Sequence, residues 1–371
     1  MSKPATLFLC GDVMTGRGID QILPHPGNPA LHESYVKNAL DYVRLAEQSA
    51  GPISRPAGFS YIWGEALEEL RTIAPDLSII NLETSITTSS DFWPAKAVHY
   101  RMDPRNIACL TAAGIDCCVL GNNHVLDFGY QGLEETLATL RKAGLACAGA
   151  GANSNEAEAP AVLEIKKTGG RCIVFGIGST TSGISPAWAA TADGAGVNLV
   201  RDLSDRTAEA IGKRVRKEAA RQGDVVVASI HWGSNWGYEV PQVQQRFAHF
   251  LVDQGADIVH GHSSHHVKGI EVYKDRPILY GCGDFLNDYE GISGYEGFRG
   301  DLGLMYFATI DTVGGKLLSM RMAPTQVRRL RVNRAPAEDA RWLRSTLDRE
   351  CKKFGCRIDM QADGSLALAW G

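Results

Sequence analysis

Polar residues of the kinds that bind metal ions stand at the ends of six short apolar runs in this chain. The runs end at Asp12, Glu83, Asn122-Asn123-His124, His231, His260-Gly261-His262 and Gly283-Asp284. Runs this apolar suit strands that are buried on both faces, and open α/β sheets bind ligands at the carboxyl ends of such strands. We therefore expect these carboxylate, amide and imidazole side chains to meet in one crevice of the folded protein.

The donors at these ends form a mixed oxygen and nitrogen set, which favours Mn, Zn or Fe over Ca. The amide of Asn123 is an unusual ligand on its own, but it completes a set with the other candidates. The candidate ligands are Asp12, Glu83, Asn123, His231, His262 and His265. A single tetrahedral ion does not need so many donors. The set therefore predicts one or two divalent ions, and two ions that share a carboxylate would use every candidate.

Several of these residues also have an ordinary structural explanation. Asp12 alone would serve to close a turn, Asn81 and Glu83 would serve as a surface pair, and His231 as a hydrogen-bonded core histidine. The run His260–His266 is different, because it places four imidazoles within seven residues. Burying them without partners costs free energy, which favours a role in metal binding or catalysis. The joint occurrence of these residues at strand ends supports the prediction more than any one of them.

Segments with a helical period lie between the apolar runs and must position them. The expected helices span residues 63–73, 132–143, 207–221 and 242–253. Strands that alternate with helices indicate the α/β class. With 371 residues and 44% apolar content the chain can bury a full core. We expect one catalytic domain over residues 1–330 and a strand and helix extension, 331–371, that packs on its outside.

Three long loop insertions interrupt the alternation, at residues 19–62, 87–105 and 179–205. Long loops inside a compact domain usually serve as lids or walls of functional sites. We interpret these loops as substrate walls, and we expect a helix from Leu31 to Tyr42 within the first. The residues expected to contact substrate are Trp93, Tyr100, Arg101, Trp232 and Asp284.

Composition limits the partners and the compartment. The net charge of -4 offers no broad basic surface, so we expect no nucleic-acid partner. The nine cysteines form no C-x-x-C pair, which fits reduced thiols in a cytoplasmic protein. No apolar stretch approaches the ~18 residues of a membrane span, and no signal peptide is recognisable. We expect a soluble cytoplasmic protein with a small-molecule or peptide substrate; the sequence leaves its oligomeric state open.

The motifs that hold these residues, taken together, resemble the CapA family. The family is named after a poly-gamma-glutamate capsule protein and is similar to the calcineurin-like metallophosphoesterases. The similarity covers roughly residues 5–310 and rests on Gly11-Asp12-Val13-Met14, Asn81-Leu82-Glu83-Thr84, Asn122-Asn123-His124 with Asp127, His231-Trp232-Gly233, Gly261-His262 to His266 and Gly283-Asp284-Phe285. The resemblance implies a four-layer α/β/β/α sandwich of metallophosphoesterase type, with two facing mixed sheets and a metal site at the strand ends.

The resemblance also implies roles for single residues. Asp12 matches the first metal-binding aspartate of the phosphoesterases, although Met14 replaces the histidine that follows it there. Glu83 stands near the bridging carboxylate, with Asn81 beside it as a further ligand. Asn123 matches the amide ligand and His231 the next histidine ligand.

The remaining motifs supply catalytic candidates. His124 matches the histidine that acts on the leaving group, and Asp127 would orient it. Where many members have Gly-x-His-x-His, this chain has Gly261-His262-Ser263-Ser264-His265. By the resemblance, His262 and His265 are ligand candidates, and His265 is a catalytic candidate as well.

These observations predict a metal-dependent enzyme of the CapA type. The first interpretation is a hydrolase that cleaves a phosphoester or a glutamyl/peptide amide with a metal-bound hydroxide. A second is a metal-dependent peptide Cα epimerase of the lasso-peptide maturation type, since the family resembles such enzymes. A third is a non-catalytic component of poly-gamma-glutamate synthesis. The chain lacks a P-loop and a G-x-S-x-G elbow, so we expect neither nucleotide-phosphate binding by a P-loop nor hydrolysis by a serine triad.

Overall fold

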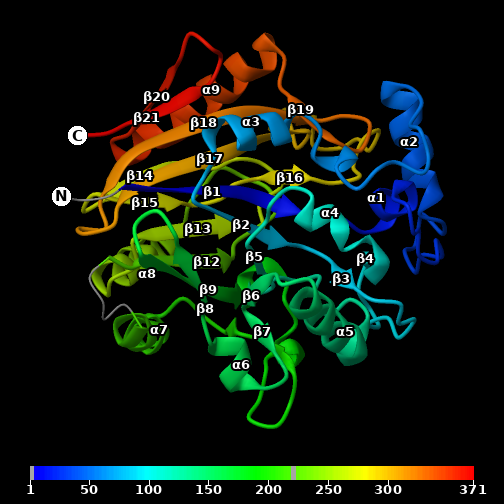
Figure 1. Ribbon diagram of the computed structural model, residues 1–371, viewed down its shortest axis with the longest axis horizontal. Coiled ribbons are helices and arrows are strands. Elements are labelled where there is room, and N and C mark those ends of the chain that lie inside the picture. Colours follow the sequence, from blue (N-terminus) through cyan, green and yellow to red (C-terminus); the bar gives the residue numbers. More distant parts are fainter. Residues whose placement is uncertain (1–3, 219–222) are drawn as a thin grey trace.

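The computed structural model describes residues 4–218 and 223–371, and these residues build a mixed α/β fold around two large sheets (Figure 1). The first sheet runs in the order β20-β21-β18-β17-β1-β2-β5-β6, with β16 beside β1 and β19 beside β18. Its strands are β1 (Pro4–Val13), β2 (Leu77–Leu82), β5 (Cys117–Val119), β6 (Ala146–Ala148), β16 (Asp284–Leu286), β17 (Leu302–Asp311), β18 (Leu317–Val327), β19 (Val332–Arg334), β20 (Arg357–Met360) and β21 (Leu366–Ala369).

The second sheet runs in the order β11-β9-β12-β13-β15-β14, with β8 beside β9. Its strands are β8 (Ala161–Ile165), β9 (Gly170–Ser179), β11 (Leu199–Val200), β12 (Val225–His231), β13 (Ile258–His262), β14 (Ile270–Tyr273) and β15 (Arg276–Leu279). Both sheets are mixed. In the first, β1 pairs parallel with β2 and antiparallel with β17; in the second, β12 pairs parallel with β13 and β14 antiparallel with β15. Two short pairs, β3 (Ser85–Ile86) with β4 (Arg101–Met102) and β7 (Ala150–Gly151) with β10 (Gly196–Val197), lie outside these sheets.

The helices pack on the sheets through separate hydrophobic clusters. The helices are α1 (Arg17–Ile22), α2 (Leu40–Ala50), α3 (Ala66–Ile73), α4 (Ala108–Thr111), α5 (Gly129–Lys142), α6 (Ser154–Glu158), α7 (Asp205–Glu218), α8 (Gln242–Asp253) and α9 (Ala337–Cys351). One cluster joins the first sheet to α1, α3, α4 and α5, and another joins the second sheet to α7 and α8. A further cluster contains residues of both sheets, such as Leu9 and Val227, so the two sheets share part of the core.

The expected strands and helices form with small shifts at their ends. The expected helix at 242–253 is α8, and the one at 132–143 is α5 with an earlier start at Gly129. The expected helix at 207–221 is α7, which begins at Asp205; residues 219–221 of that prediction lie outside the described part of the chain. In the first insertion the prediction of a helix from Leu31 to Tyr42 is wrong, because α2 begins only at Leu40.

The run from Ile278 to Asp284 is not one strand. Its first part lies in β15 of the second sheet, and its last residue begins β16 of the first sheet. The chain crosses between the sheets at Gly283, whose φ of +78° is a left-handed conformation that glycine adopts without strain. This crossing places Asp284 directly beside Asp12.

The C-terminal tail contributes both to the first sheet and to the buried core. Strands β20 and β21 pair with each other, and β21 pairs with β18, so the tail extends the first sheet. Helix α9 buries Leu343, Leu347 and Cys351 in the cluster that the two sheets share. None of the helices in the described part of the chain has the length and apolar character needed to span a bilayer.

Candidate functional site

The strand ends bring the predicted residues together from both sheets. In the first sheet, Asp12 on β1 lies in register with Asn81 on β2 and with Asp284 on β16. In the second sheet, His231 at the end of β12 lies in register with His262 at the end of β13. The site is therefore built where the ends of the two sheets meet.

Asp12, His231 and His262 converge most closely. One potential ligand atom from each lies within 4.8 Å of those of the others, and all three side chains are buried. His231 Nδ1 and His262 Nδ1 are 2.8 Å apart. Burial holds the pKa of both imidazoles well below the usual value, so both are neutral near pH 7. Two ring nitrogens at this separation cannot both carry protons, so at least one lone pair is available to an ion.

Asn81 supports the Asp12 carboxylate. Its Nδ2 donates to Asp12 Oδ1 at 2.7 Å, and the backbone N–H of Ser263 donates to Oδ2 at 3.2 Å. The Asn81 oxygen in turn accepts a hydrogen bond of 3.0 Å from Asn122 Nδ2. Burial, with the nearby Asp284 carboxylate, raises the pKa of Asp12 to about 7, although hydrogen bonds from Glu83 and Asn81 act to lower it. In this arrangement Asn81 orients a ligand, and its predicted role as a ligand itself is not tested.

Glu83 adds a second buried carboxylate. Its Oε1 lies 3.7 Å from His124 Nε2, and no residue of the described chain hydrogen-bonds to its Oε2. Burial and the neighbouring Asp12 carboxylate raise the pKa of Glu83 well above its usual value. Two buried carboxylates and two neutral imidazoles form a donor set suited to a divalent cation. The charge of the cation would offset the repulsion between the two carboxylates. The residues present therefore fit the predicted metal.

Asn123 lies at the edge of this group, with its Oδ1 2.9 Å from His231 Nε2. The preceding Asn122 fixes the turn, because its Oδ1 accepts from the backbone N–H groups of His124 and Val125 at 3.0 and 3.1 Å. The amide oxygen of Asn123 thus lies next to one of the candidate ligand histidines.

His124 is held by Asp127 and by a residue that the sequence analysis missed. His124 Nδ1 lies 2.7 Å from Asp127 Oδ2 and 2.9 Å from Lys96 Nζ, and Lys96 also contacts Asp127 Oδ1 at 2.5 Å. Burial, assisted by the positive charge of Lys96, lowers the pKa of His124 well below its usual value. Lys96 comes from the second insertion, where no periodic pattern marks it. The only signal for a role in the site was its position in a long loop, close to Trp93 in the sequence.

His265 lies apart from the closest three residues and pairs with Asp284. Its Nδ1 is 3.0 Å from Asp284 Oδ1, and Asn287 donates to the other carboxylate oxygen at 2.9 Å. Burial acts to lower the pKa of His265, but the Asp284 carboxylate outweighs this and raises it. The other two histidines of the run have structural partners. His260 Nε2 donates to the carbonyl oxygen of Cys10 at 2.8 Å, and the ring of His266 stacks on Phe298.

The residues predicted to contact substrate lie in different surroundings. Tyr100 stacks on His124 with 3.8 Å between ring centroids, and Trp93 lies against Trp188. Arg101 donates to the backbone carbonyls of Ser89 and Asn28. Trp232 is buried in the cluster under α8, with its Nε1 donating to the Tyr280 carbonyl, so its predicted contact with substrate gains no support from its position.

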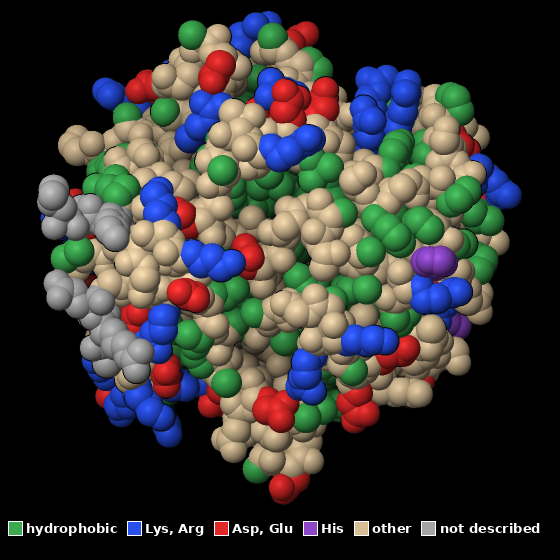
Figure 2. All heavy atoms as spheres, in the orientation of Figure 1, with side chains coloured by type: hydrophobic (Ala, Val, Ile, Leu, Met, Phe, Trp, Pro, Cys, Tyr) green, Lys and Arg blue, Asp and Glu red, His purple; other side chains and the backbone are tan. Residues whose placement is uncertain are grey.

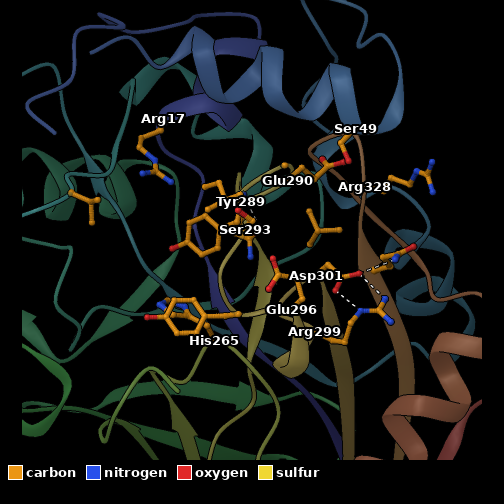
Figure 3. A pocket seen from close by; sticks show the side chains of 18 of the residues that line it. Arg17, Ser49, His265, Tyr289, Glu290, Ser293, Glu296, Arg299, Asp301 and Arg328 are labelled. Atoms are coloured by element: carbon orange, nitrogen blue, oxygen red, sulfur yellow. Dashed lines mark hydrogen bonds and ion pairs between the residues drawn. The ribbon is translucent and has the colours of Figure 1, made fainter. Parts of the chain in front are cut away.

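A cavity of about 570 Å³ opens beside the site (Figure 3). This volume is within the range of about 300–1,000 Å³ typical of small-molecule sites. Tyr100, His265 and Tyr289 are among the residues that line it, and the hydroxyl groups of the two tyrosines are 2.5 Å apart. Arg17 also lines the cavity, and its guanidinium is bound by the buried carboxylates of Glu33 and Asp288. Nothing in the sequence marks Arg17, because its partners Glu33 and Asp288 lie elsewhere in the chain.

Known proteins resemble this chain over most of its length. Residues 6–289 match the family described as bacterial capsule synthesis protein PGA_cap. A protein of Mycobacterium tuberculosis (strain H37Rv) named as a probable polyglutamine synthesis accessory protein is 47% identical over 364 residues, which cover 98% of this chain and 95% of that protein. The PGA biosynthesis protein CapA of Bacillus subtilis is 26% identical over 279 residues, which cover 75% of this chain and 62% of that protein.

Proposed function

The chain belongs to the bacterial capsule synthesis protein family PGA_cap, the CapA family, and from this premise we propose that it is a metal-dependent hydrolase acting on a glutamyl or peptide amide or a phosphoester. The observation that supports the proposal is the convergence of Asp12, His231 and His262 within 4.8 Å at one end of the fold. The names of the relatives, polyglutamine synthesis and PGA biosynthesis, favour a glutamyl polymer or its fragments as the substrate. Cytoplasmic location is part of the same proposal and is supported by the free cysteines of the described chain.

We infer that the fold is the four-layer sandwich of the metallophosphoesterases. Three hydrophobic clusters support this arrangement: one under the helices of the first sheet, one shared by the two sheets, and one under α7 and α8. In this arrangement the metal lies at one end of the shared cluster, where β1, β12 and β13 end.

The residues of the site divide the chemistry between them. Asp12, Glu83, His231 and His262 would hold one or two divalent ions of Mn, Zn or Fe, with Asn123 as an additional oxygen donor. When bound, such an ion supplies positive charge that polarises a carbonyl or phosphoryl oxygen, and it acidifies water. His124, with Nε2 facing Glu83 and Nδ1 held by Asp127 and Lys96, would accept at Nε2 the proton that the attacking water loses and pass it to the departing group.

The cavity residues would bind the substrate next to these groups. Tyr100 fixes the plane of the His124 ring by stacking on it, and it receives support from Tyr289 through their hydroxyl contact. His265, whose pKa is raised by Asp284, would contribute a lining ring held by Asp284 at Nδ1 and by Asn235 at Nε2. These positions would orient the bond to be cleaved toward the metal ligands.

Metal content and turnover test the proposal together. Protein grown with ample Mn, Zn and Fe is expected to contain about one to two of these ions per chain by elemental analysis. Asp12→Ala and His231→Ala are expected to lose the metal, whereas His249→Ala, a histidine of α8 paired with Glu271, keeps it. His124→Ala is expected to keep the metal and lose release of amine from γ-glutamyl peptides or of phosphate from phosphodiesters. Metal-free wild-type protein, or full turnover in His124→Ala, would contradict the proposal.

A non-catalytic accessory role is the second candidate. It is favoured by the name of the Mycobacterium tuberculosis relative and by Met14, which stands where the phosphoesterases resembled by this family have a ligand histidine. The epimerase alternative uses the same site, and incubation of peptides in heavy water separates the candidates. Deuterium at Cα without cleavage identifies an epimerase; neither cleavage nor exchange, with metal still bound, identifies the accessory role.

A further inference from the structure

Three buried side chains behind the candidate metal site form a hydrogen-bonded row. Ser229 on β12 lies in register with His260 on β13, and two residues further along both strands His231 lies in register with His262. Residues two apart on a strand point to the same side of the sheet. Ser229, His260 and His262 are fully buried. Accordingly, Figure 2 shows histidine side chains at the right-hand edge of the molecule, near α1 and β4, and other side-chain types over β12 and β13.

The Ser229 hydroxyl stands at the centre of this row. Its Oγ lies 3.0 Å from His260 Nδ1 and also 3.0 Å from His262 Nε2. The other ring nitrogen of His260, Nε2, lies 2.8 Å from the carbonyl oxygen of Cys10 on β1. The other ring nitrogen of His262, Nδ1, faces Asp12, whose Oδ1 is 3.8 Å away. The row therefore connects a backbone carbonyl at one end to a candidate metal ligand at the other.

The protons of this row have one consistent arrangement. A carbonyl oxygen only accepts hydrogen bonds, so His260 Nε2 carries a proton and donates it to Cys10. Burial lowers the pKa of His260 to about 4, so its ring is neutral near pH 7 and Nδ1 has a lone pair. The Ser229 hydroxyl therefore donates to His260 Nδ1. Because a hydroxyl has a single hydrogen, Ser229 Oγ accepts in its other contact, and His262 Nε2 must carry the proton there.

The same arrangement decides which nitrogen of His262 is free. Burial keeps the His262 ring neutral, because it holds the pKa well below its usual value. A neutral imidazole with its proton on Nε2 has its lone pair on Nδ1. His262 Nδ1 is the nitrogen that faces Asp12 and lies 2.8 Å from His231 Nδ1. The metal-free protein therefore already presents this lone pair to the candidate site.

We propose that Ser229 and His260 are positioning residues that hold His262 in the tautomer with its lone pair on Nδ1, the nitrogen that would bind the metal ion. Both residues act through His262 and stand outside the set of candidate ligands. Groups that hydrogen-bond to a ligand histidine fix its tautomer and ring orientation, and losing one typically costs about 10–100-fold in metal affinity. The inference rests on the proposed function for the metal ion, whereas the tautomer is a property of the metal-free protein.

Nitrogen NMR of the metal-free, full-length protein, labelled with ¹⁵N at histidine, tests the tautomer near pH 7. The His262 signals are those that His262→Ala removes. We expect Nε2 of His262 to be protonated and Nδ1 to be unprotonated in the wild type; a proton on Nδ1 would overturn the proposal.

Two variants test whether the row fixes this tautomer. Ser229→Ala removes the acceptor of the Nε2 proton, and His260→Ala frees the Ser229 hydroxyl to donate to Nε2. Each variant is expected to increase the share of His262 rings that carry the proton on Nδ1. An unchanged tautomer in both variants would overturn the roles of Ser229 and His260. The wild-type spectrum decides the proposal if neither variant folds.

The affinity for Zn²⁺, measured by competition with a chromophoric chelator, is an independent readout. Ser229→Ala is expected to bind Zn²⁺ about 10–100-fold more weakly than the wild type, and Ser229→Thr, which keeps the hydroxyl, to bind it nearly as tightly. The control Ser365→Ala removes another buried serine hydroxyl, which donates to Asp363 beside β21, and is expected to bind as the wild type does.

The inference and the proposed function can fail separately. Equal Zn²⁺ affinity in Ser229→Ala and Ser365→Ala would overturn the positioning role. A wild type that binds no Zn²⁺ would contradict the proposed function, and the NMR result would then decide the tautomer by itself.

Discussion

At the scale of single residues, the protonation of Asp12 contributes to setting the pH above which the candidate site can bind a cation. The imidazoles of His231 and His262 are neutral near pH 7 because burial lowers their pKa values, so protons do not compete with a metal there. Burial raises the pKa of Asp12 from 3.8 to about 7, so its proton does compete. Metal ligands must be deprotonated to bind, and metal binding therefore releases this proton.

We expect the apparent metal affinity to fall as pH decreases, because the raised pKa values of Asp12 and Glu83 make protons compete with the ion for both carboxylates. Because folding raises the pKa of Asp12 above its unfolded value of 3.8, the metal-free protein should lose stability as pH rises from there to about 7. Asp12→Asn should remove that part of the loss. Titration calorimetry and urea unfolding across pH measure both effects. As a control, Asp257→Asn changes another buried aspartate, paired with Arg276, and should leave the affinity profile unchanged.

Residue types and spacing predicted the members of the site that stand at strand ends. His231 and His262 meet because the parallel strands β12 and β13 end at a common edge, which a sequence pattern can show, whereas Asp12 reaches them from β1 of the other sheet. Lys96 and Arg17 were not predicted, because each acts through partners that only tertiary folding brings close: His124 with Asp127, and Glu33 with Asp288. Lys96 lies in an irregular loop, where no periodicity would mark it.

At the scale of elements, the junction of β1 and β16 sets the distance between Asp12 and Asp284. Gly11 lies against the backbone of Gly283, and a Cβ added at Gly11 would be 1.7 Å from the Gly283 carbonyl oxygen. The backbone N–H of Asp12 donates to that same oxygen at 2.9 Å. Only glycine at position 11 allows the crossing chain to approach so closely.

Gly11→Ala is therefore expected to destabilise the fold by roughly 1–3 kcal/mol or more and to reduce metal content, because the crossing must move away from β1. Urea unfolding and elemental analysis measure the two effects. Gly58→Ala is the matched control, since its added Cβ meets no atom within 4 Å. A stability equal to that of Gly58→Ala would show that the crossing adjusts freely.

Elements with a strong period were predictable, and elements fixed by tertiary partners were not. Helix α8 matches its apolar stripe from Gln242 to Asp253. The segment before α2 instead forms a closed loop, in which the Ala39 N–H bonds to the Pro29 carbonyl and Glu33 is buried against Arg17. This buried ion pair outweighs the helical pattern that residues 31–42 show in isolation.

At the scale of the whole molecule, the C-terminal tail is needed for the common core. Leu347 of α9 is fully buried in the cluster that holds residues of both sheets. The sequence predicts a strand and a helix in the tail that pack on the domain, but the pairing of β21 with β18 joins segments distant in the chain and could not be read from it.

Leu347→Ala is expected to lower the free energy of unfolding by about 2–5 kcal/mol, the usual cost of a cavity in a well-packed core. Leu318→Ala, which truncates a leucine that is 50% exposed on β18, should change it much less. Urea unfolding followed by fluorescence compares them. Similar losses in the two variants would mean that the tail contributes little to the core.

The candidate ligands come from two different sheets, Asp12 from one and His231 with His262 from the other. A cation bound there would link the two sheets. The supply of that cation would therefore affect the folding stability of the protein as well as its proposed activity. At a free concentration one hundred times the dissociation constant, such a ligand adds about 2.7 kcal/mol to stability. The melting temperature of the protein would then rise with the free concentration of that metal ion.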